Sequence, residues 1–173
     1  MKAALIAAAL LLVTCCARAE ESSPEAVVDR YMAAISASDW DAMRALLAEH
    51  AHYEDRTMAY FDRGPVDLRG ADAVVEFWRS SSEAAGSGVV RYERRGGFVA
   101  GPVVALELRV FVDNDGAAWG MPGVQFTGEM DVISLIEVRD GRVAWHMDAA
   151  DYAAALDQVE TLQEAFKAGA AQP

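Results

Sequence analysis

The chain has 173 residues, of which 53% are hydrophobic, and a formal net charge of −12 at pH 7. This length and this hydrophobic content predict one domain with a core of its own and exclude a disordered chain. The acidic balance leaves no surface that would neutralise phosphates, so we expect no nucleic-acid partner and no attraction to anionic lipid.

The first nineteen residues predict a secretory signal peptide. Lys2 supplies a positive start, residues 3–13 form an apolar run, and Ala17 and Ala19 make an A-x-A cleavage site. The apolar run is much shorter than the ~20 residues of a membrane-spanning helix. We therefore expect residues 1–19 to be removed during export rather than kept as an anchor.

Cleavage would change the chemistry of the chain. Both cysteines, Cys15 and Cys16, lie in the removed segment, and the loss of Lys2 and Arg18 takes the net charge from −12 to −14. We expect a periplasmic or secreted domain over residues 20–173 with no disulfide and no thiolate metal site. A lipoprotein anchored at Cys15 or Cys16 is the alternative, and lipidation is the one route by which we expect membrane attachment.

Helices are predicted at both ends of the exported part. Ser23 followed by Pro24 is typical of a helix start, and apolar residues then recur at helical spacing. Further helices are expected from Ser38 and from Gly70, and a C-terminal amphipathic helix over about residues 150–168. Between the second and third helices we expect a short strand over residues 51–56 and a long loop over residues 57–69. That loop, with Met58, Tyr60 and Phe61, would form either a lid or a dimer contact.

The second half of the chain predicts strands. Residues 89–99, 103–112, 124–138 and 142–148 read as strands joined by turns at Gly101-Pro102 and at residues 139–141. Helices followed by a meander predict an α+β fold, in which a curled, cone-shaped antiparallel sheet packs on the N-terminal helices. Such a cystatin-like α+β barrel has an internal pocket, which is the default ligand site of a small domain. The aromatic side chains of Phe77, Trp40, Trp78 and Trp145 are expected in the core.

The alternation of side chains along the strands predicts which polar residues face that pocket. Tyr53 and Asp55 share one face of the first strand, and a carboxylate in an apolar cavity is suited to proton transfer because burial raises its pKa. In the last strand we expect Val143, Trp145 and Met147 to face the core, with His146 and Asp148 together on the other face. Periodicity leaves open whether that second face is solvated or forms a pocket wall.

Metal and cofactor sites are not predicted. The sequence contains no glycine-rich phosphate loop and no Ser-His-Asp spacing typical of nucleophilic catalysis. His50 and His52 flank Ala51 and are expected on a solvated strand or loop rather than on a metal. We therefore expect no cofactor and no metal ion.

Several motifs resemble the bacterial Δ5-3-ketosteroid isomerases. These are Arg30-Tyr31-Met32-Ala33-Ala34, Asp39-Trp40-Asp41-Ala42-Met43 and His52-Tyr53-Glu54-Asp55. The hairpin Arg139-Asp140-Gly141-Arg142-Val143 resembles SnoaL-like proteins of the same nuclear-transport-factor-2-like superfamily. The resemblance covers about residues 24–152. It implies that Tyr31 donates a hydrogen bond to a developing enolate, that Asp55 carries the proton and that the chain forms a homodimer.

The pattern departs from that isomerase at two positions. The second oxyanion donor of the isomerase would fall at Ser134 or Ile133 here, and Trp78 takes the place of a supporting tyrosine. The stretch from Trp145 to Asp151 resembles limonene-epoxide hydrolase, which would make Asp148 catalytic and give Tyr53 and Asp55 water-positioning roles. Because Glu107 and Arg109 carry the charges of that family's middle strand in the reverse order, we rank hydrolysis below proton transfer.

The sequence thus supports two main hypotheses. The first is an enzyme that moves a proton on a neutral, hydrophobic carbonyl compound. Its expected catalytic residues are Asp55, Tyr31 and Asp148, and its expected substrate contacts are Tyr53, Trp78, Ser134 and His146. The second is a non-catalytic module that uses the same pocket to bind a small hydrophobic molecule or to dimerise.

Overall fold

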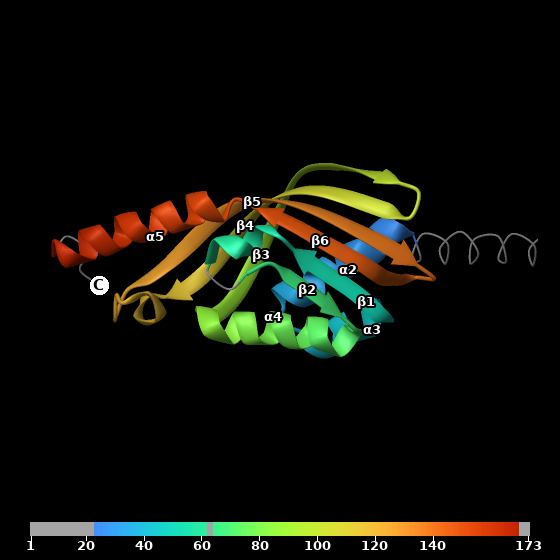
Figure 1. The fold of residues 1–173 in the computed structure, drawn as a ribbon, viewed down its shortest axis with the longest axis horizontal. Coiled ribbons are helices and arrows are strands. Elements are labelled where there is room, and N and C mark those ends of the chain that lie inside the picture. Colours follow the sequence, from blue (N-terminus) through green and yellow to red (C-terminus); the bar gives the residue numbers. More distant parts are fainter. Residues whose placement is uncertain (1–22, 62–63, 170–173) are drawn as a thin grey trace, which may run out of the picture.

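The computed structural model describes residues 23–61 and 64–169, so the predicted signal peptide lies outside the described residues. Figure 1 shows a curved sheet with helices on its concave side and one further helix at its end. In chain order the elements are α2 (Pro24–Ser36), α3 (Trp40–Leu46), β1 (Leu47–Asp55), the 3-10 helix η1 (Thr57–Phe61), β2 (Val66–Arg69), α4 (Ala71–Ala85), β3 (Gly86–Ala100), β4 (Val103–Asp115), the 3-10 helix η2 (Gly116–Trp119), β5 (Gln125–Arg139), β6 (Arg142–Ala150) and α5 (Tyr152–Lys167).

The two N-terminal helices begin where their capping residues predict. The side chain of Ser23 accepts a hydrogen bond from the backbone N–H of Ala26, and Pro24 occupies the first turn of α2. Asp39 caps α3 in the same way by accepting from the N–H of Ala42. The predicted apolar face of α2 is buried, and its members form part of the core: Val27, Val28, Tyr31, Met32 and Ile35.

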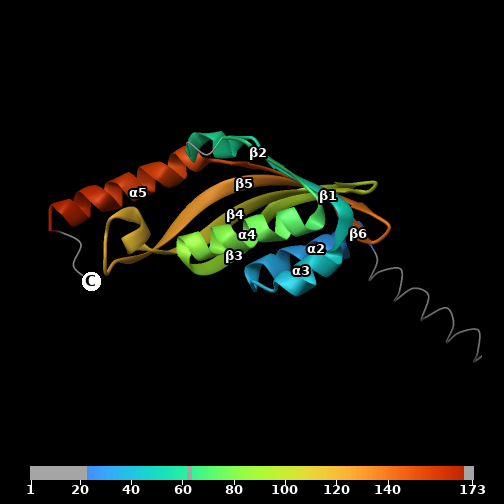
Figure 2. The same ribbon diagram turned by 60° about the horizontal axis from the view of Figure 1, so that its bottom comes forward.

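The six strands form one mixed sheet in the order β2-β1-β6-β5-β4-β3. The sheet arches over α2, α3 and α4, as Figures 1 and 2 show from two sides. The expected antiparallel pairing is confirmed for four of the strand pairs, and the fifth pair, β1 with β6, is parallel. Tight turns fix the antiparallel pairs β3–β4 and β5–β6, whereas parallel strands pair through long connections that leave no local sequence signal.

A bulge in β6 changes which residues face the core. Glu137 pairs with Trp145 while Val138 pairs with Val143, so Ala144 is an extra residue in the ladder. Val143 and His146 are therefore both buried on the concave face. The prediction that Trp145 packs in the core was wrong, because its indole N–H donates 2.8 Å to a Glu54 oxygen on the opposite face.

The predicted alternation in β1 is confirmed, whereas the expected long loop is not. Tyr53 and Asp55 are buried, and His52 lies on the other face with its ring nitrogen 3.0 Å from Asp67 Oδ1. Residues 57–69 contain η1 and the short strand β2, which pairs antiparallel with β1. The side chains of Tyr60 and Phe61 lie outside the described part of the structure, so the proposed lid or dimer contact is not tested there.

Helix α5 extends from one end of the sheet (Figures 1 and 2). Its Gln158 side chain makes two hydrogen bonds with the backbone of Glu129 in β5, and Gln163 donates to the carbonyl of Trp119. Asp157 and Glu160 on this helix are exposed, as expected for the polar side of an amphipathic helix. Within residues 23–61 and 64–169, no helix is long and apolar enough to cross a membrane.

Candidate active site

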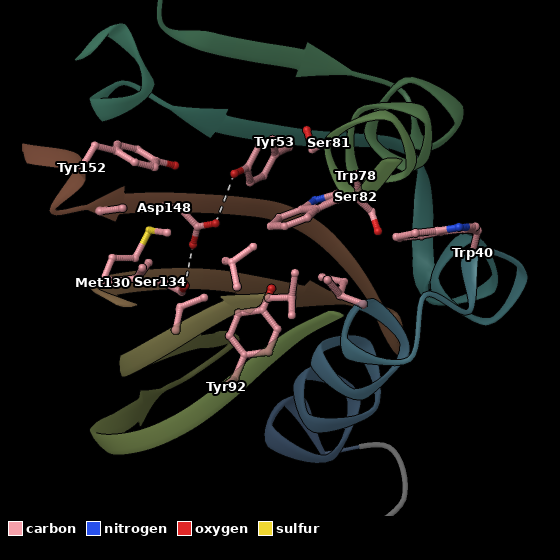
Figure 3. Close-up of a pocket in the computed structure, with 16 residues that line it drawn as sticks. Trp40, Tyr53, Trp78, Ser81, Ser82, Tyr92, Met130, Ser134, Asp148 and Tyr152 are labelled. Carbon is pink, nitrogen blue, oxygen red and sulfur yellow. Dashed lines mark hydrogen bonds between the residues drawn. The ribbon is translucent and has the colours of Figure 1, made fainter. Parts of the chain in front are cut away.

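A cavity of about 160 Å³ lies between the helices and the concave face of the sheet. Most of its lining is aliphatic or aromatic, and Asp148 is the one charged residue among the described residues that line it. Figure 3 shows side chains from both the helices and the strands converging on this space. The lining residues that the argument below uses are Trp40, Tyr53, Trp78, Tyr92, Ser134, Asp148 and Tyr152.

Asp148 on β6 is held by three side chains. Tyr53 Oη donates to Asp148 Oδ2 at 3.1 Å, while Ser134 Oγ and His146 Nε2 both donate to Oδ1, the latter at 2.9 Å. Ser134 is the direct partner of Asp148 across β5 and β6, so the ladder itself places the two side chains together. A carboxylate has about four acceptor sites, so three donors leave one site free, on Oδ2.

His146 connects the carboxylate to helix α2. Because a carboxylate only accepts, the Nε2–H of His146 points to Asp148, which leaves Nδ1 facing Tyr31 Oη at 3.2 Å. The imidazole is stacked parallel to the indole of Trp78 and meets the ring of Tyr53 edge-on. These contacts bury Tyr31 and His146 and fix the imidazole in one orientation.

The environment keeps Asp148 ionised. Burial opposes its charge, but the neighbouring His146 and the hydrogen bonds from His146, Ser134 and Tyr53 together hold its pKa below the ordinary value. The pKa values of Tyr31 and Tyr53 are raised, first by burial and then by the negative charge of Asp148. The site therefore combines one carboxylate acceptor with protonated phenols.

Asp55 has a different environment from the one expected for a base. It is completely buried, and its Oδ1 accepts from the N–H and the hydroxyl of Thr57 and from the N–H of Met58. Its Oδ2 accepts from Tyr152 Oη at 2.7 Å. Four donors thus hold this carboxylate, three of them on Oδ1, and through them Asp55 keeps η1 and the start of α5 in place. Asp55 is not among the residues that line the cavity.

The three expected catalytic side chains therefore do not meet in the cavity. Asp148 lines it, whereas Asp55 and Tyr31 lie behind its wall. Ser134 lines the cavity, whereas Ile133, the other position at which the isomerase's second donor could fall, is exposed over 47% of its surface. Trp78 lines the cavity, but its Nε1 is enclosed with no hydrogen-bond partner, so the indole contributes apolar surface rather than a donor.

Sequence reasoning missed two cavity residues. Tyr152 is the first residue of α5; the amphipathic pattern of that helix did not nominate it, yet it lines the cavity and its hydroxyl donates to Asp55. Tyr92 on β3 was not singled out, although it alternates in phase with Val90, which also lines the cavity. That alternation was the available signal, and it was obscured by the charged residues on either side of Tyr92.

The charged pair considered for epoxide hydrolysis lies outside the cavity. Arg109 contacts Glu129 at 3.2 Å and Asp131 at 2.9 Å on the outer face of the sheet, and Glu107 is exposed. On the same strand the cavity is lined by Val110 and Val112. Within the described part of the chain, no group of three or more His, Cys, Asp or Glu residues could hold a metal ion.

A curved sheet that closes over N-terminal helices to form an internal cavity defines the nuclear-transport-factor-2/ketosteroid-isomerase-like fold. Residues 28–146 match the family of SnoaL-like domains. The chain belongs to this family. The comparison with curated proteins returned no match.

Solved structures with the same fold carry several activities in their descriptions. A protein of Shewanella putrefaciens described as a SnoaL-like polyketide cyclase is 16% identical, with a TM-score of 0.69 over 80% of this chain and 86% of that one. IdmH of Streptomyces antibioticus, described as a polyketide cyclase, is 19% identical with a TM-score of 0.65 over 80% and 99%. An epoxide hydrolase of M. tuberculosis, similar to limonene-epoxide hydrolase, is 17% identical with a TM-score of 0.61 over 83% and 93%. At these identities the likeness establishes the fold alone.

Proposed function

We propose that this protein binds a neutral, hydrophobic carbonyl compound in the cavity and moves a proton on the carbon next to the carbonyl group. The observation that carries the proposal is the position of Asp148. It is a carboxylate at the wall of an apolar cavity with one unused acceptor site on Oδ2. Its lowered pKa keeps it ionised, as a base must be, and makes it a weaker base than an aspartate of ordinary pKa. Asp148 thus takes the role of base that the isomerase resemblance gave to Asp55.

The proposed step needs no co-reactant. The C–H bond next to the carbonyl breaks and its proton passes to Asp148 Oδ2. The electron pair of that bond forms a C=C bond to the carbonyl carbon, and the π pair of the C=O bond moves onto the oxygen to give an enolate. Asp148 then returns this proton to a conjugated carbon, which isomerises the substrate, or returns a proton that it has exchanged with solvent to the same carbon, which exchanges the substrate's hydrogen. His146, Ser134 and Tyr53 orient the carboxylate, and Tyr31 positions His146.

The size of the cavity limits the substrate. An apolar cavity of about 150 Å³ accommodates benzene, whereas sites for drug-sized ligands occupy about 300–1,000 Å³. At about 160 Å³, the cavity of this protein fits one six-membered ring. We therefore propose a substrate with a single ring or a short branched chain, smaller than a steroid.

Hydrogen exchange tests the proposal without knowledge of the natural substrate. Cyclohexanone in D₂O is mixed with the protein, and the loss of its α-proton signal is followed by NMR. We expect exchange by the wild type and a fall of about 10²–10⁴-fold for Asp148→Asn, the range that general acid–base groups contribute. The matched control is Asp113→Asn, because Asp113 does not line the cavity and accepts hydrogen bonds from Arg91 and Thr127. If wild type and Asp148→Asn exchange at equal rates, Asp148 is not the base.

Ligand binding without catalysis is the second candidate function. It is favoured by the same network, because three of the four acceptor sites of Asp148 are already used within the protein. In that case cyclohexanone would bind with a measurable Kd, and its α-protons would not exchange faster than in buffer.

We also propose export and self-association. Export predicts a mature N-terminus at Glu20 in the periplasmic or secreted fraction, which intact-protein mass spectrometry measures, and an unprocessed chain would contradict it.

A homodimer is supported by the resemblance and by Ile133, a large apolar side chain exposed on the outer sheet face. Light scattering should then give twice the mass of the chain, and Ile133→Glu should lower it; a wild-type monomer would contradict the proposal.

A further inference from the structure

Tyr92 differs from the other tyrosines around the cavity. Tyr31, Tyr53 and Tyr152 direct their hydroxyl groups to His146, Asp148 and Asp55 respectively. Tyr92 Oη makes no hydrogen bond with any described residue. Trp78 Nε1 also has no partner, but that atom is fully enclosed by protein. Tyr92 Oη is not enclosed in this way, so its oxygen borders the open space of the cavity.

The curvature of the sheet places this hydroxyl opposite the carboxylate. Tyr92 belongs to β3 and Asp148 to β6, with β5 and β4 between them in the sheet. Figure 3 shows the phenol of Tyr92 pointing into the cavity from the side opposite Tyr53 and Tyr152, with its oxygen toward the interior. A ligand in the cavity therefore lies between an acceptor, Asp148 Oδ2, and an unpaired donor, Tyr92 Oη.

Such a pair of groups selects a particular kind of ligand. An unpaired hydroxyl on an apolar wall loses its hydrogen bond to water when a hydrocarbon enters, and it regains one when the ligand carries an oxygen acceptor. A carbonyl compound supplies that acceptor and, on the adjacent carbon, the proton that a carboxylate can remove. A hydrocarbon of the same shape supplies neither.

We propose that Tyr92 donates the hydrogen bond that holds the substrate's carbonyl oxygen and stabilises the negative charge that forms there. This inference rests on the proposed proton transfer by Asp148 and names its second catalytic group, a role that the isomerase resemblance gave to Tyr31. As the C–H bond breaks and the C=C bond forms, the π pair of the carbonyl group moves onto its oxygen, and Tyr92 keeps its proton while its hydrogen bond to that oxygen strengthens.

The electrostatics of the cavity agree with this role. Burial, and secondarily the charge of Asp148, raise the pKa of Tyr92 above its ordinary value. The phenol therefore remains protonated and able to donate at neutral and moderately alkaline pH.

The test compares two ligands of the same shape, cyclohexanone and methylenecyclohexane, in which =CH₂ replaces =O. We expect the wild type to bind the ketone about fivefold more tightly, the effect of one hydrogen bond, and Tyr92→Phe to bind both about equally. Tyr92→Phe should also slow α-proton exchange by about 10²-fold or more. Tyr152→Phe is the matched control: because the Tyr152 hydroxyl donates to Asp55, its loss should leave the ratio of the two binding affinities unchanged.

The outcomes separate this inference from the proposed function. A ketone preference that Tyr92→Phe abolishes supports Tyr92 as the ligand's donor even when the wild type exchanges no α-protons, a result that would reject proton transfer alone. A ketone preference that survives in a folded Tyr92→Phe protein, or its absence from the wild type, overturns the inference. Far-ultraviolet circular dichroism establishes that each variant is folded.

Discussion

Asp55 and Asp148 are direct partners across the parallel strands β1 and β6, yet only Asp148 borders the cavity. The two carboxylates also differ in their hydrogen bonds. Asp55 accepts from four donors that hold η1 and α5, whereas Asp148 accepts from three and faces open space. Two neighbouring carboxylates of one sheet therefore have separate roles, one in holding the fold together and one in the proposed chemistry.

Replacement of Asp55 should affect stability first. Asp55→Asn removes the charge that strengthens hydrogen bonds from Thr57, Met58 and Tyr152, and hydrogen bonds to charged groups contribute about 1.5–3 kcal/mol each. We expect a loss of about 2–3 kcal/mol in the free energy of unfolding, measured by urea denaturation. Thr57→Val, which removes one of the donors, should give a smaller loss. An Asp55→Asn protein as stable as the wild type would contradict the role of Asp55 in holding η1 and the start of α5.

Tyr31 should act on the site through His146. Tyr31→Phe leaves Nδ1 of a buried imidazole without its partner, which costs about 1–3 kcal/mol of stability. Because Tyr31 does not line the cavity, we expect a lower kcat for α-proton exchange with little change in KM. The preference for cyclohexanone over methylenecyclohexane should persist. Loss of that preference in Tyr31→Phe would instead make Tyr31 the donor to substrate, as the isomerase resemblance implied.

Acid should destabilise the protein through Asp148. The folded pKa of this residue is lowered, so the unfolded carboxyl, with a pKa of about 3.9, takes up a proton at a higher pH than the folded one does. The stabilisation is complete above that unfolded value and is lost as the pH falls through the folded pKa. The melting temperature of the wild type should therefore fall more steeply below about pH 4 than that of Asp148→Asn. Parallel declines in the two proteins would contradict the lowered pKa.

Local signals in the sequence predicted much of the fold. The caps at Ser23 and Asp39 mark the starts of α2 and α3, and the alternation of Tyr53 with Asp55 correctly places both side chains inside. What the sequence did not reveal depends on contacts between distant segments. The parallel pairing of β1 with β6 and the bulge at Ala144 have no local pattern, and together they place His146 and Asp148 inside rather than on a solvated face.

In the candidate site, too, the sequence predicted what local patterns determine and did not predict what depends on contacts between distant segments. Alternation nominates Asp55 as an inward carboxylate, but it cannot show that Thr57, Met58 and Tyr152 occupy its oxygens. Nor could alternation decide whether the His146 and Asp148 face was a pocket wall. Tyr92 could have been found, because it is in phase with Val90 on a strand expected to form the barrel, but its unpaired hydroxyl is a property of the folded cavity.

The most direct test compares the two carboxylates in one assay. The substrate is 3-cyclohexen-1-one, whose conversion to the conjugated 2-cyclohexen-1-one is followed by ultraviolet absorbance, with rates expressed per folded molecule. The account predicts isomerisation by the wild type, a rate about 10²–10⁴-fold lower for Asp148→Asn, and most of the wild-type rate for Asp55→Asn. Full activity in Asp148→Asn together with its loss in Asp55→Asn would contradict the central claim and make Asp55 the base.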